Sequence, residues 1–372
     1  MARSHTRGIA LFLALALVAC GGARPTAPGG GGGNGTGGGG GGGTGGTTNP
    51  PPTLLRGVSL SPSGFPADFS HLNDFFNEVA GFGRGAVMWN GAWRDDAVNG
   101  TDAGTLPAGA GLVADAAQGG TRFAPVAVFG WRSGQTLFIR VPANQTNDWS
   151  NTAARTAFTT VVRTFAATYH PKLLFLGNES DFYAEQNAAD YVRWVAAYND
   201  AYDAIKAASP ETRVGPIFSV EHMMGWGAFS GWTTPHTEAF TLHDRSRIDV
   251  VGLTLYPYLG RAAAADVPAN YLDPVFALLG NIPIAITETG WPASAGTPVA
   301  WQPGDSQQTT YLGRLSTMIQ GHSALLVNWL FLYPLSAGSP DALTTFGTVS
   351  LRDQAGNKRA VYDAFLGLGS GQ

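Results

Sequence analysis

Two glutamates in this chain occupy the same kind of position, directly after a short apolar run. Glu179 closely follows the run Leu173–Leu176, and Glu288 directly follows the run Ile284–Thr287. If the fold brings them together, mutual repulsion and partial burial would keep one carboxyl group protonated near neutral pH. One group could then protonate a leaving oxygen while the other attacks or activates water, which is what cleavage of a glycosidic bond requires. The alternative is that both are rim carboxylates held in salt bridges.

The chain from residue 54 onward predicts the elements that would position these glutamates. Eight apolar runs have the length and composition of strands: Gly57–Leu60, Gly85–Trp89, Ala124–Phe129, Leu173–Leu176, Val214–Phe218, Val250–Leu255, Ile284–Thr287 and Leu325–Leu330. Helix-like stretches lie between and after them: Phe69–Ala80, Gly111–Ala117, Ala153–Thr168, Asp190–Ala208, Pro235–Leu242, Ala269–Leu279, Gln307–Gln320 and Ala360–Leu368.

This alternation predicts an α/β fold. Strands separated by helices pair in parallel, and strands apolar on both faces belong to a sheet covered on both sides. Eight such units predict a (β/α)8 TIM barrel, a single catalytic domain over residues 54–372, with an open doubly wound sheet as the alternative. In the barrel, the C-terminal strand ends meet at one mouth, so Glu179 and Glu288 would share it.

The residues around both glutamates resemble those of a known group of proteins. Asn178-Glu179 after the fourth strand and Glu288 after the seventh resemble glycoside hydrolase clan A, the retaining (β/α)8 glycosidases. The string Glu-Thr-Gly-Trp-Pro at 288–292, with Tyr-Pro-Tyr at 256–258, is similar to family 17 β-1,3-glucanases, and Gly-Asn-Glu at 177–179 is shared by family 17 and the family 53 β-1,4-galactanases. The resemblance implies that Glu179 is the general acid/base, Glu288 the nucleophile, and Asn178 a ligand of the sugar 2-hydroxyl.

Other polar and aromatic residues near strand ends are candidates for substrate binding. Tyr256 ends the sixth strand, next to the seventh, and is expected to hydrogen-bond Glu288. Trp329, near the end of the eighth strand, is a candidate stacking platform, with core packing as the alternative. His222 is a candidate hydrogen-bond donor, with a satisfied rim histidine as the alternative. Exposed indoles after strand ends would suit the apolar faces of sugars, unless they pack the loops down: Trp89, Trp131 and Trp291.

The sequence predicts neither a metal nor a cofactor. Glu221, His222, His236 and His243 carry metal-ligating side chains, but their spacing fits no ligand motif. The glycine-rich tract Gly29–Gly46 matches the nucleotide-binding pattern Gly-x-Gly-x-x-Gly, but it follows no predicted strand, so the match carries no information.

The first 53 residues predict export and anchoring. Arg3 and Arg7 precede the apolar run Ile9–Val18, which is too short to span a bilayer and is typical of a signal peptide. The run ends in Leu-Val-Ala-Cys, which resembles the bacterial lipobox and implies acylation at Cys20. We therefore expect a lipoprotein signal peptide over 1–20 and a glycine-rich flexible tether over 21–53. The chain would be lipid-anchored in the bacterial envelope, periplasmic or outer-facing; an ordinary secretory signal is the alternative.

Composition narrows the expected partners. The net charge is −4 without basic runs, which argues against nucleic acid, and 44% hydrophobic residues can build a sizeable core. We expect a monomer that contacts membrane only through its lipid and acts on polysaccharide or oligosaccharide, endo-acting within chains. Two rival functions use the same features: a glycan-binding surface lipoprotein that no longer cleaves, and a transglycosylase with the same two glutamates.

Overall fold

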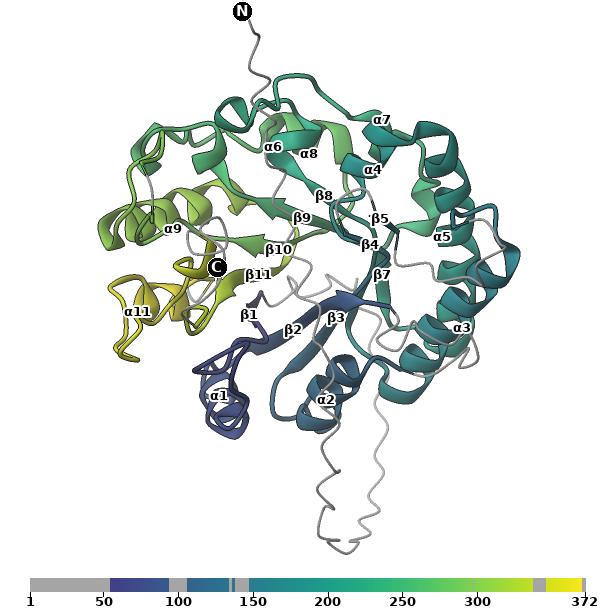
Figure 1. Ribbon diagram of the computed structural model, residues 1–372, viewed down its shortest axis with the longest axis horizontal. Helices are drawn as coiled ribbons and strands as arrows, with labels where there is room; N and C mark the ends of the chain where they lie inside the picture. The colour runs from purple at the N-terminus through teal and green to yellow at the C-terminus, as the bar shows by residue number, and fades with distance from the viewer. Residues whose placement is uncertain are drawn as a thin grey trace, which may run out of the picture.

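A computed structural model describes residues 54–93, 106–133, 136–137, 147–296, 298–336 and 346–369. Parallel strands form a ring in the order β7-β6-β3-β2-β1-β11-β10-β9-β8, and helices surround it (Figure 1). The strands are β1 (Leu55–Ser59), β2 (Gly85–Ala92), β3 (Ala124–Gly130), β6 (Leu173–Leu176), β7 (Arg213–Gly215), β8 (Ile217–Ser219), β9 (Val251–Leu255), β10 (Ile284–Thr289) and β11 (Ala324–Phe331). The fold is the (β/α)8 barrel that the sequence predicts, and all eight predicted strands are confirmed.

The fifth strand of the barrel is divided in two at Pro216. Its first half, β7, pairs with β6, and its second half, β8, pairs with β9. A proline has no N–H to donate to a ladder, so the strand is interrupted there. The Pro216 carbonyl still accepts from the Gly252 N–H at 2.9 Å. Nine strand segments therefore fill the eight strand positions of the barrel.

The helices that correspond to predicted stretches cover the outside of the ring: α1 (Leu72–Ala80), α2 (Ala108–Ala116), α3 (Thr152–Tyr169), α5 (Ala188–Ala208), α7 (Glu238–Thr241), α8 (Asp273–Leu279), α9 (Asp305–Ile319) and α11 (Val361–Leu366). Other short elements were not predicted: α4 (Asp181–Gln186), α6 (Val220–Met223), the hairpin of β4 (Arg132–Ser133) and β5 (Thr136–Leu137), and the 3-10 turns η1 (Ala228–Ser230), η2 (Arg245–Arg247), η3 (Pro257–Leu259) and η4 (Ala264–Asp266). No helix among the described residues is long and apolar enough to cross a bilayer.

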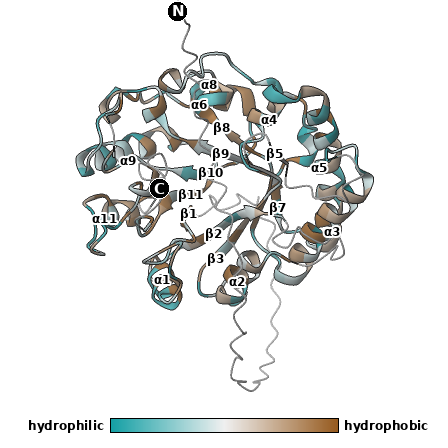
Figure 2. Ribbon diagram, in the orientation of Figure 1, coloured by the Kyte–Doolittle hydropathy of each residue, from teal (hydrophilic) through white to brown (hydrophobic). Residues whose placement is uncertain are grey.

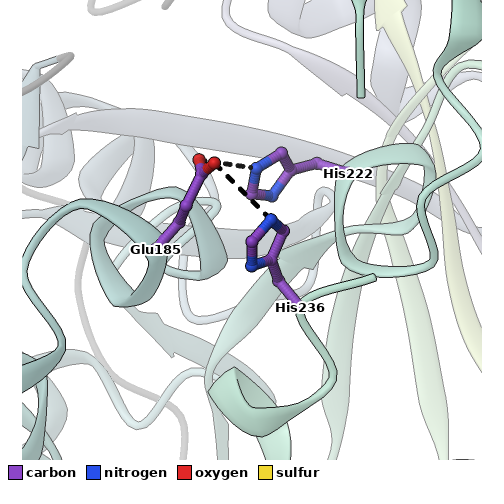
Figure 3. Close-up of side chains that lie close together, drawn as sticks. All are labelled: Glu185, His222 and His236. Atoms are coloured by element: carbon purple, nitrogen blue, oxygen red, sulfur yellow. Dashed lines mark hydrogen bonds and ion pairs between the residues drawn. The ribbon is translucent and has the colours of Figure 1, made fainter. Parts of the chain in front are cut away.

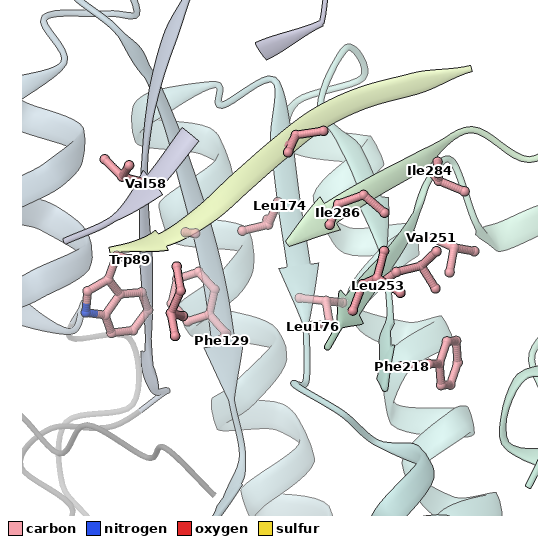
Figure 4. Close-up of a cluster of buried hydrophobic side chains, with 14 of the residues drawn as sticks. Val58, Trp89, Phe129, Leu174, Leu176, Phe218, Val251, Leu253, Ile284 and Ile286 are labelled. Atoms are coloured by element: carbon pink, nitrogen blue, oxygen red, sulfur yellow. The ribbon is translucent and has the colours of Figure 1, made fainter. Parts of the chain in front are cut away.

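The buried apolar side chains form two clusters on opposite faces of the sheet. One fills the inside of the ring and includes Met88, Phe175 and Leu326. The larger one lies between the ring and the helices, with side chains such as Leu174 and Leu253 (Figure 4), and hydrophobic segments recur along the strands of the ring (Figure 2). Since successive side chains of a strand point to opposite faces, this alternation decides which residues can reach the barrel mouth.

Candidate active site

Glu288 faces the barrel mouth because the register of β10 shifts just before it. Ile286 pairs with Leu253 of β9, whereas Glu288 pairs with the next residue, Thr254, so that Thr287 is an extra residue in β10. An extra residue of this kind reverses the alternation of side chains, as in a bulge. Ile286 packs in the cluster under the helices, yet Glu288, two positions later, points inward. Glu288 is 9% exposed.

Three side chains from three parts of the ring donate to the Glu288 carboxylate. Asn90 Nδ2, near the end of β2, donates to Oε1 at 2.9 Å, and Asn178 Nδ2 donates to the same oxygen at 3.3 Å. The Tyr256 hydroxyl donates to Oε2 at 3.1 Å. Burial raises the pKa of the Glu288 carboxyl above its ordinary value, while these three hydrogen bonds act in the opposite direction by stabilising the anion. The carboxylate is thus fixed in position by a set of converging donors.

Glu179 stands on a turn with an unusual backbone. Gly177, directly after β6, has φ +82°, and Glu179 itself has φ +47°, a left-handed conformation that a non-glycine residue adopts at a cost of about 1–3 kcal/mol. A side chain at Gly177 would place its Cβ 2.6 Å from the Trp131 indole nitrogen, so the turn packs too closely for anything larger. Such strain gathers at functional sites, where the surrounding structure holds it in place.

The two glutamates are joined through Thr254. The Thr254 hydroxyl donates to Glu179 Oε1 at 2.7 Å, and Thr254 is also the register partner of Glu288. Asn178 provides a second link, because it precedes Glu179 in the chain and its side chain donates to Glu288. Glu179 is half-buried, whereas Glu288 lies deeper. Two carboxyl groups of different exposure therefore meet at one barrel mouth, at the strand ends where the sequence places them.

Tyr256 makes the contact with Glu288 that the sequence predicts. Burial, and after it the negative charge of Glu288, raises the pKa of Tyr256 well above its ordinary value, so the phenol keeps its proton and remains a donor. Its backbone N–H donates to Glu221 Oε2 at 2.9 Å. Glu221 is fully buried and also accepts from the Tyr271 hydroxyl at 3.2 Å, and burial raises its pKa to about 7. Glu221 thus fixes the backbone of Tyr256, whose hydroxyl donates to Glu288.

Asn90 and Thr254 are site residues that no motif in the sequence indicates. Each is a polar residue in a strand that is otherwise apolar, and each lies on the face of its strand that looks into the barrel. That polarity close to a strand end was the available signal. Asn90 lies one residue beyond the predicted strand Gly85–Trp89, and Thr254 lies within the predicted strand Val250–Leu255.

The expectation of exposed indoles must be corrected for three tryptophans. Trp89 is 2% exposed and packs against Phe129 (Figure 4), with ring centroids 5.4 Å apart. Trp131 is also buried and stacks among other aromatic rings beneath the Gly177 turn. Trp291 is completely buried, and its indole N–H donates to the Gln302 carbonyl at 2.7 Å. None of the three presents a ring face on which a sugar could stack, so they pack the loops, which was the alternative interpretation.

Trp329 is a further correction, and strand alternation gives the reason. Its neighbour Asn328 faces the barrel interior, where its Nδ2 donates to Ser59 Oγ at 3.1 Å. Trp329 therefore faces outward, where it is completely buried against Tyr311 and Phe365 of the surrounding helices. It does not form the expected platform at the mouth.

His222 is 1% exposed and contacts α4 rather than the open mouth. Its Nδ1 lies 2.7 Å from Asp181 Oδ2, and its ring stacks on Phe182 at 3.8 Å between centroids. This corrects its assignment as a sugar hydrogen-bond donor. The His222 ring is not accessible from the mouth, and its two nitrogen atoms already contact the carboxylates of Asp181 and Glu185. The predicted lipidation residue Cys20, with the signal peptide 1–20 and the tether 21–53, lies outside the described residues.

Comparisons with known proteins agree with this architecture. No protein-family model matches the chain, and no curated protein matches it either. Among solved structures, the exo-β-1,4-mannosidase Op5Man5 from Opitutaceae bacterium strain TAV5 is 17% identical with a TM-score of 0.59, over 86% of this chain but only 59% of that one. A GH5_18 protein from Bifidobacterium longum subsp. longum, in complex with Manβ1-4GlcNAc, is 13% identical with a TM-score of 0.63, over 86% of this chain and 78% of that one. Bacteroides uniformis β-glucuronidase 2 is 13% identical with a TM-score of 0.55, over 85% of this chain and 35% of that one.

These likenesses are likenesses of fold. They place the chain among (β/α)8 barrels of the kind that glycosidases use, and the resemblance to families 17 and 53 stays a prediction.

Proposed function

We propose that the chain is a retaining O-glycosidase that hydrolyses β-linked polysaccharide by double displacement. The observation that carries the proposal is the Glu288 carboxylate, buried at the barrel mouth and held by three donors beside a second, more exposed carboxyl group on Glu179. Glycoside hydrolysis requires two carboxyl groups in different environments at one site, one as general acid and one as nucleophile or base.

Each group has a role that suits its surroundings. The Glu288 carboxylate attacks the anomeric carbon, while Glu179 gives its proton to the departing glycosidic oxygen. In the second step Glu179 takes a proton from water, which attacks the same carbon and releases Glu288. Asn178 is placed to bind the 2-hydroxyl next to the reacting carbon. Its Oδ1 is buried without a hydrogen-bond partner among the described residues, and a buried acceptor of this kind calls for one.

Two observations bear on the substrate class, and they favour different polysaccharides. The resemblance in sequence favours β-1,3-glucan or β-1,4-galactan, whereas two of the fold neighbours are described with β-1,4-mannosidic compounds. Endo action is part of the proposal; it rests on the expected tether and on aromatic side chains after the strand ends, of which Trp89, Trp131 and Trp291 are buried. Trp226 and Trp232, in the segment after β8, are half-buried, and their rings contact Tyr271 and Phe182 respectively.

The test is product release by the full-length chain on β-1,3-glucan, mixed-linkage glucan, β-1,4-galactan, mannan, xylan and Manβ1-4GlcNAc. We expect one class to be cleaved, and Glu288→Gln to lower kcat by about a thousandfold or more because the covalent step is lost. Glu211→Gln, which changes an exposed carboxylate, is the matched control and should keep full activity.

Other outcomes identify the rival functions. Retention of more than about a tenth of the activity in Glu288→Gln would remove this residue from the nucleophile's role. Binding of a polymer by the folded chain without any cleavage would instead indicate a glycan-binding protein. Products longer than the substrate would indicate a transglycosylase.

We further propose that lipid on Cys20 anchors the chain in the bacterial envelope, which rests on the lipobox-like string before it.

A further inference from the structure

Three potential metal ligands from separate segments meet beside α4, although the sequence predicts no metal site. Glu185 lies on α4, His222 on α6, and His236 in the segment before α7 (Figure 3). Glu185 Oε2 is 3.1 Å from His222 Nε2, and Glu185 Oε1 is 3.5 Å from His236 Nε2. A donor atom from each of the three lies within 4.8 Å of the other two.

Each histidine is also held on its far side by a carboxylate. His222 Nδ1 lies 2.7 Å from Asp181 Oδ2, and His236 Nδ1 lies 3.2 Å from Glu238 Oε1. A carboxylate that accepts from Nδ1 fixes the ring and leaves the Nε2 lone pair for a metal, which is the usual support of zinc-binding histidines. Here both Nε2 atoms point at the same carboxylate. Two supported histidines and one carboxylate therefore converge on one point.

The separations suit a zinc ion. Bonds of 2.0–2.1 Å in a tetrahedron place neighbouring ligand atoms about 3.4 Å apart. The separations of 3.1 and 3.5 Å from Glu185 to the two histidines are close to this value, and the upper bound of 4.8 Å for the set allows at most about 1.4 Å of adjustment. The site is reachable, because the Glu185 side chain is 46% exposed and that of His236 is 14% exposed, while His222 is almost completely buried. We propose that Glu185, His222 and His236 form a Zn²⁺ site, with Asp181 and Glu238 supporting the histidines and a water completing the tetrahedron.

The ion would add a further link among three segments that already contact one another, for example through the His236 N–H, which donates to the Met223 carbonyl at 2.8 Å. α4 begins two residues after Glu179, and Asp181 also accepts from the backbone N–H of Ser219 at 2.9 Å. The bound ion would therefore stabilise the segment that follows Glu179 without touching the barrel mouth. The competing explanation is an ion-pair cluster in which two protonated histidines share the Glu185 carboxylate, without any metal.

Titration of the chelator-treated, full-length chain with ZnSO4 distinguishes the two explanations. We expect one Zn²⁺ per chain with a Kd of about 10 µM or tighter, and a rise in the thermal unfolding temperature. His236→Ala removes a ligand and should weaken binding by about 100-fold, and Glu238→Gln, which alters an exposed supporting carboxylate, by about tenfold. His71→Ala, which changes an exposed histidine directly before α1, is the matched control and should bind as the unmodified chain does. Ca²⁺, which prefers oxygen ligands, should not compete.

X-ray absorption at the zinc edge provides the second readout, independent of stability. We expect nitrogen and oxygen ligands at about 2.0–2.2 Å and no sulfur at about 2.3 Å. Sulfur in the coordination sphere would place the ion on Cys20 and overturn the proposal. Absence of saturable binding, or equal affinity in His236→Ala and the unmodified chain, would also overturn it, in favour of the ion-pair cluster.

Discussion

The buried carboxyl group of Glu221 should make the unfolding free energy depend on pH, and Glu221→Gln should remove this contribution. The pKa of Glu221 is raised from 4.5 to about 7, chiefly by burial, against hydrogen bonds from Tyr256 and Tyr271 that lower it. Between these two values the folded chain binds a proton that the unfolded chain does not. The stabilising contribution is therefore fully present below about pH 4.5 and is lost as the pH rises through 7.

The magnitude follows from the size of the shift. A difference of about 2.5 pKa units corresponds to about 3 kcal/mol of unfolding free energy, of which about 2.5 kcal/mol is lost between pH 5 and pH 8. His243 acts in the opposite direction, because burial lowers its pKa to about 3 and the unfolded chain takes up a proton below about pH 6.5. The pH dependence of the unmodified chain alone therefore mixes the two effects.

A comparison with Glu221→Gln isolates the contribution of Glu221. Urea unfolding of both full-length chains, followed by tryptophan fluorescence between pH 5 and pH 8, gives the difference in unfolding free energy at each pH. His243 is present in both chains and cancels. We expect the unmodified chain to lose about 2.5 kcal/mol relative to the variant over this range. Glu211→Gln, at an exposed carboxylate, should give a curve parallel to that of the unmodified chain. Parallel curves for Glu221→Gln, or a difference of the opposite sign, would refute the reasoning.

Two further predictions concern the site and the anchor. Tyr256→Phe removes a hydrogen bond to the buried Glu288 carboxylate, so kcat/KM should fall by about tenfold or more, and the acid limb of its pH profile should move to higher pH. An unchanged profile would show that the hydroxyl does not support the ionised carboxylate. Cys20→Ser should release the chain from the membrane fraction of the expressing bacterium, and unchanged partitioning would mean that Cys20 is not the anchor.

The barrel could be predicted from the sequence because its strands are short, apolar on both faces and separated by amphipathic helices. The fifth strand was found as a single run, and only its division at Pro216 required the structure. The helices α4 and α6 were missed because six and four residues are too few to establish a helical period. They carry Glu185 and His222, two of the three residues of the proposed Zn²⁺ site.

The metal-ligand cluster shows a different limit of sequence reasoning. Ligand motifs describe spacing within one segment, such as two histidines on one helix. Glu185 and His222 are far apart in the chain, and they meet only because the barrel brings the segments after β6 and β8 to the same edge. Neither composition nor local spacing contains that information.

Glu179, Glu288 and Tyr256 could be identified because each is a polar side chain at the end of an apolar strand. Their orientation could not, and β10 shows why. In a regular strand, residues two positions apart lie on the same face. Since Ile286 faces the helices, Glu288 would then face outward too, away from Asn90 and Tyr256. One extra residue, Thr287, reverses this. Asn328 and Trp329 are adjacent in a regular stretch of β11, so they face opposite sides: Asn328 points into the barrel and Trp329 points outward. The face that a strand residue presents, rather than its chemical type, thus decides which side chains form the candidate site.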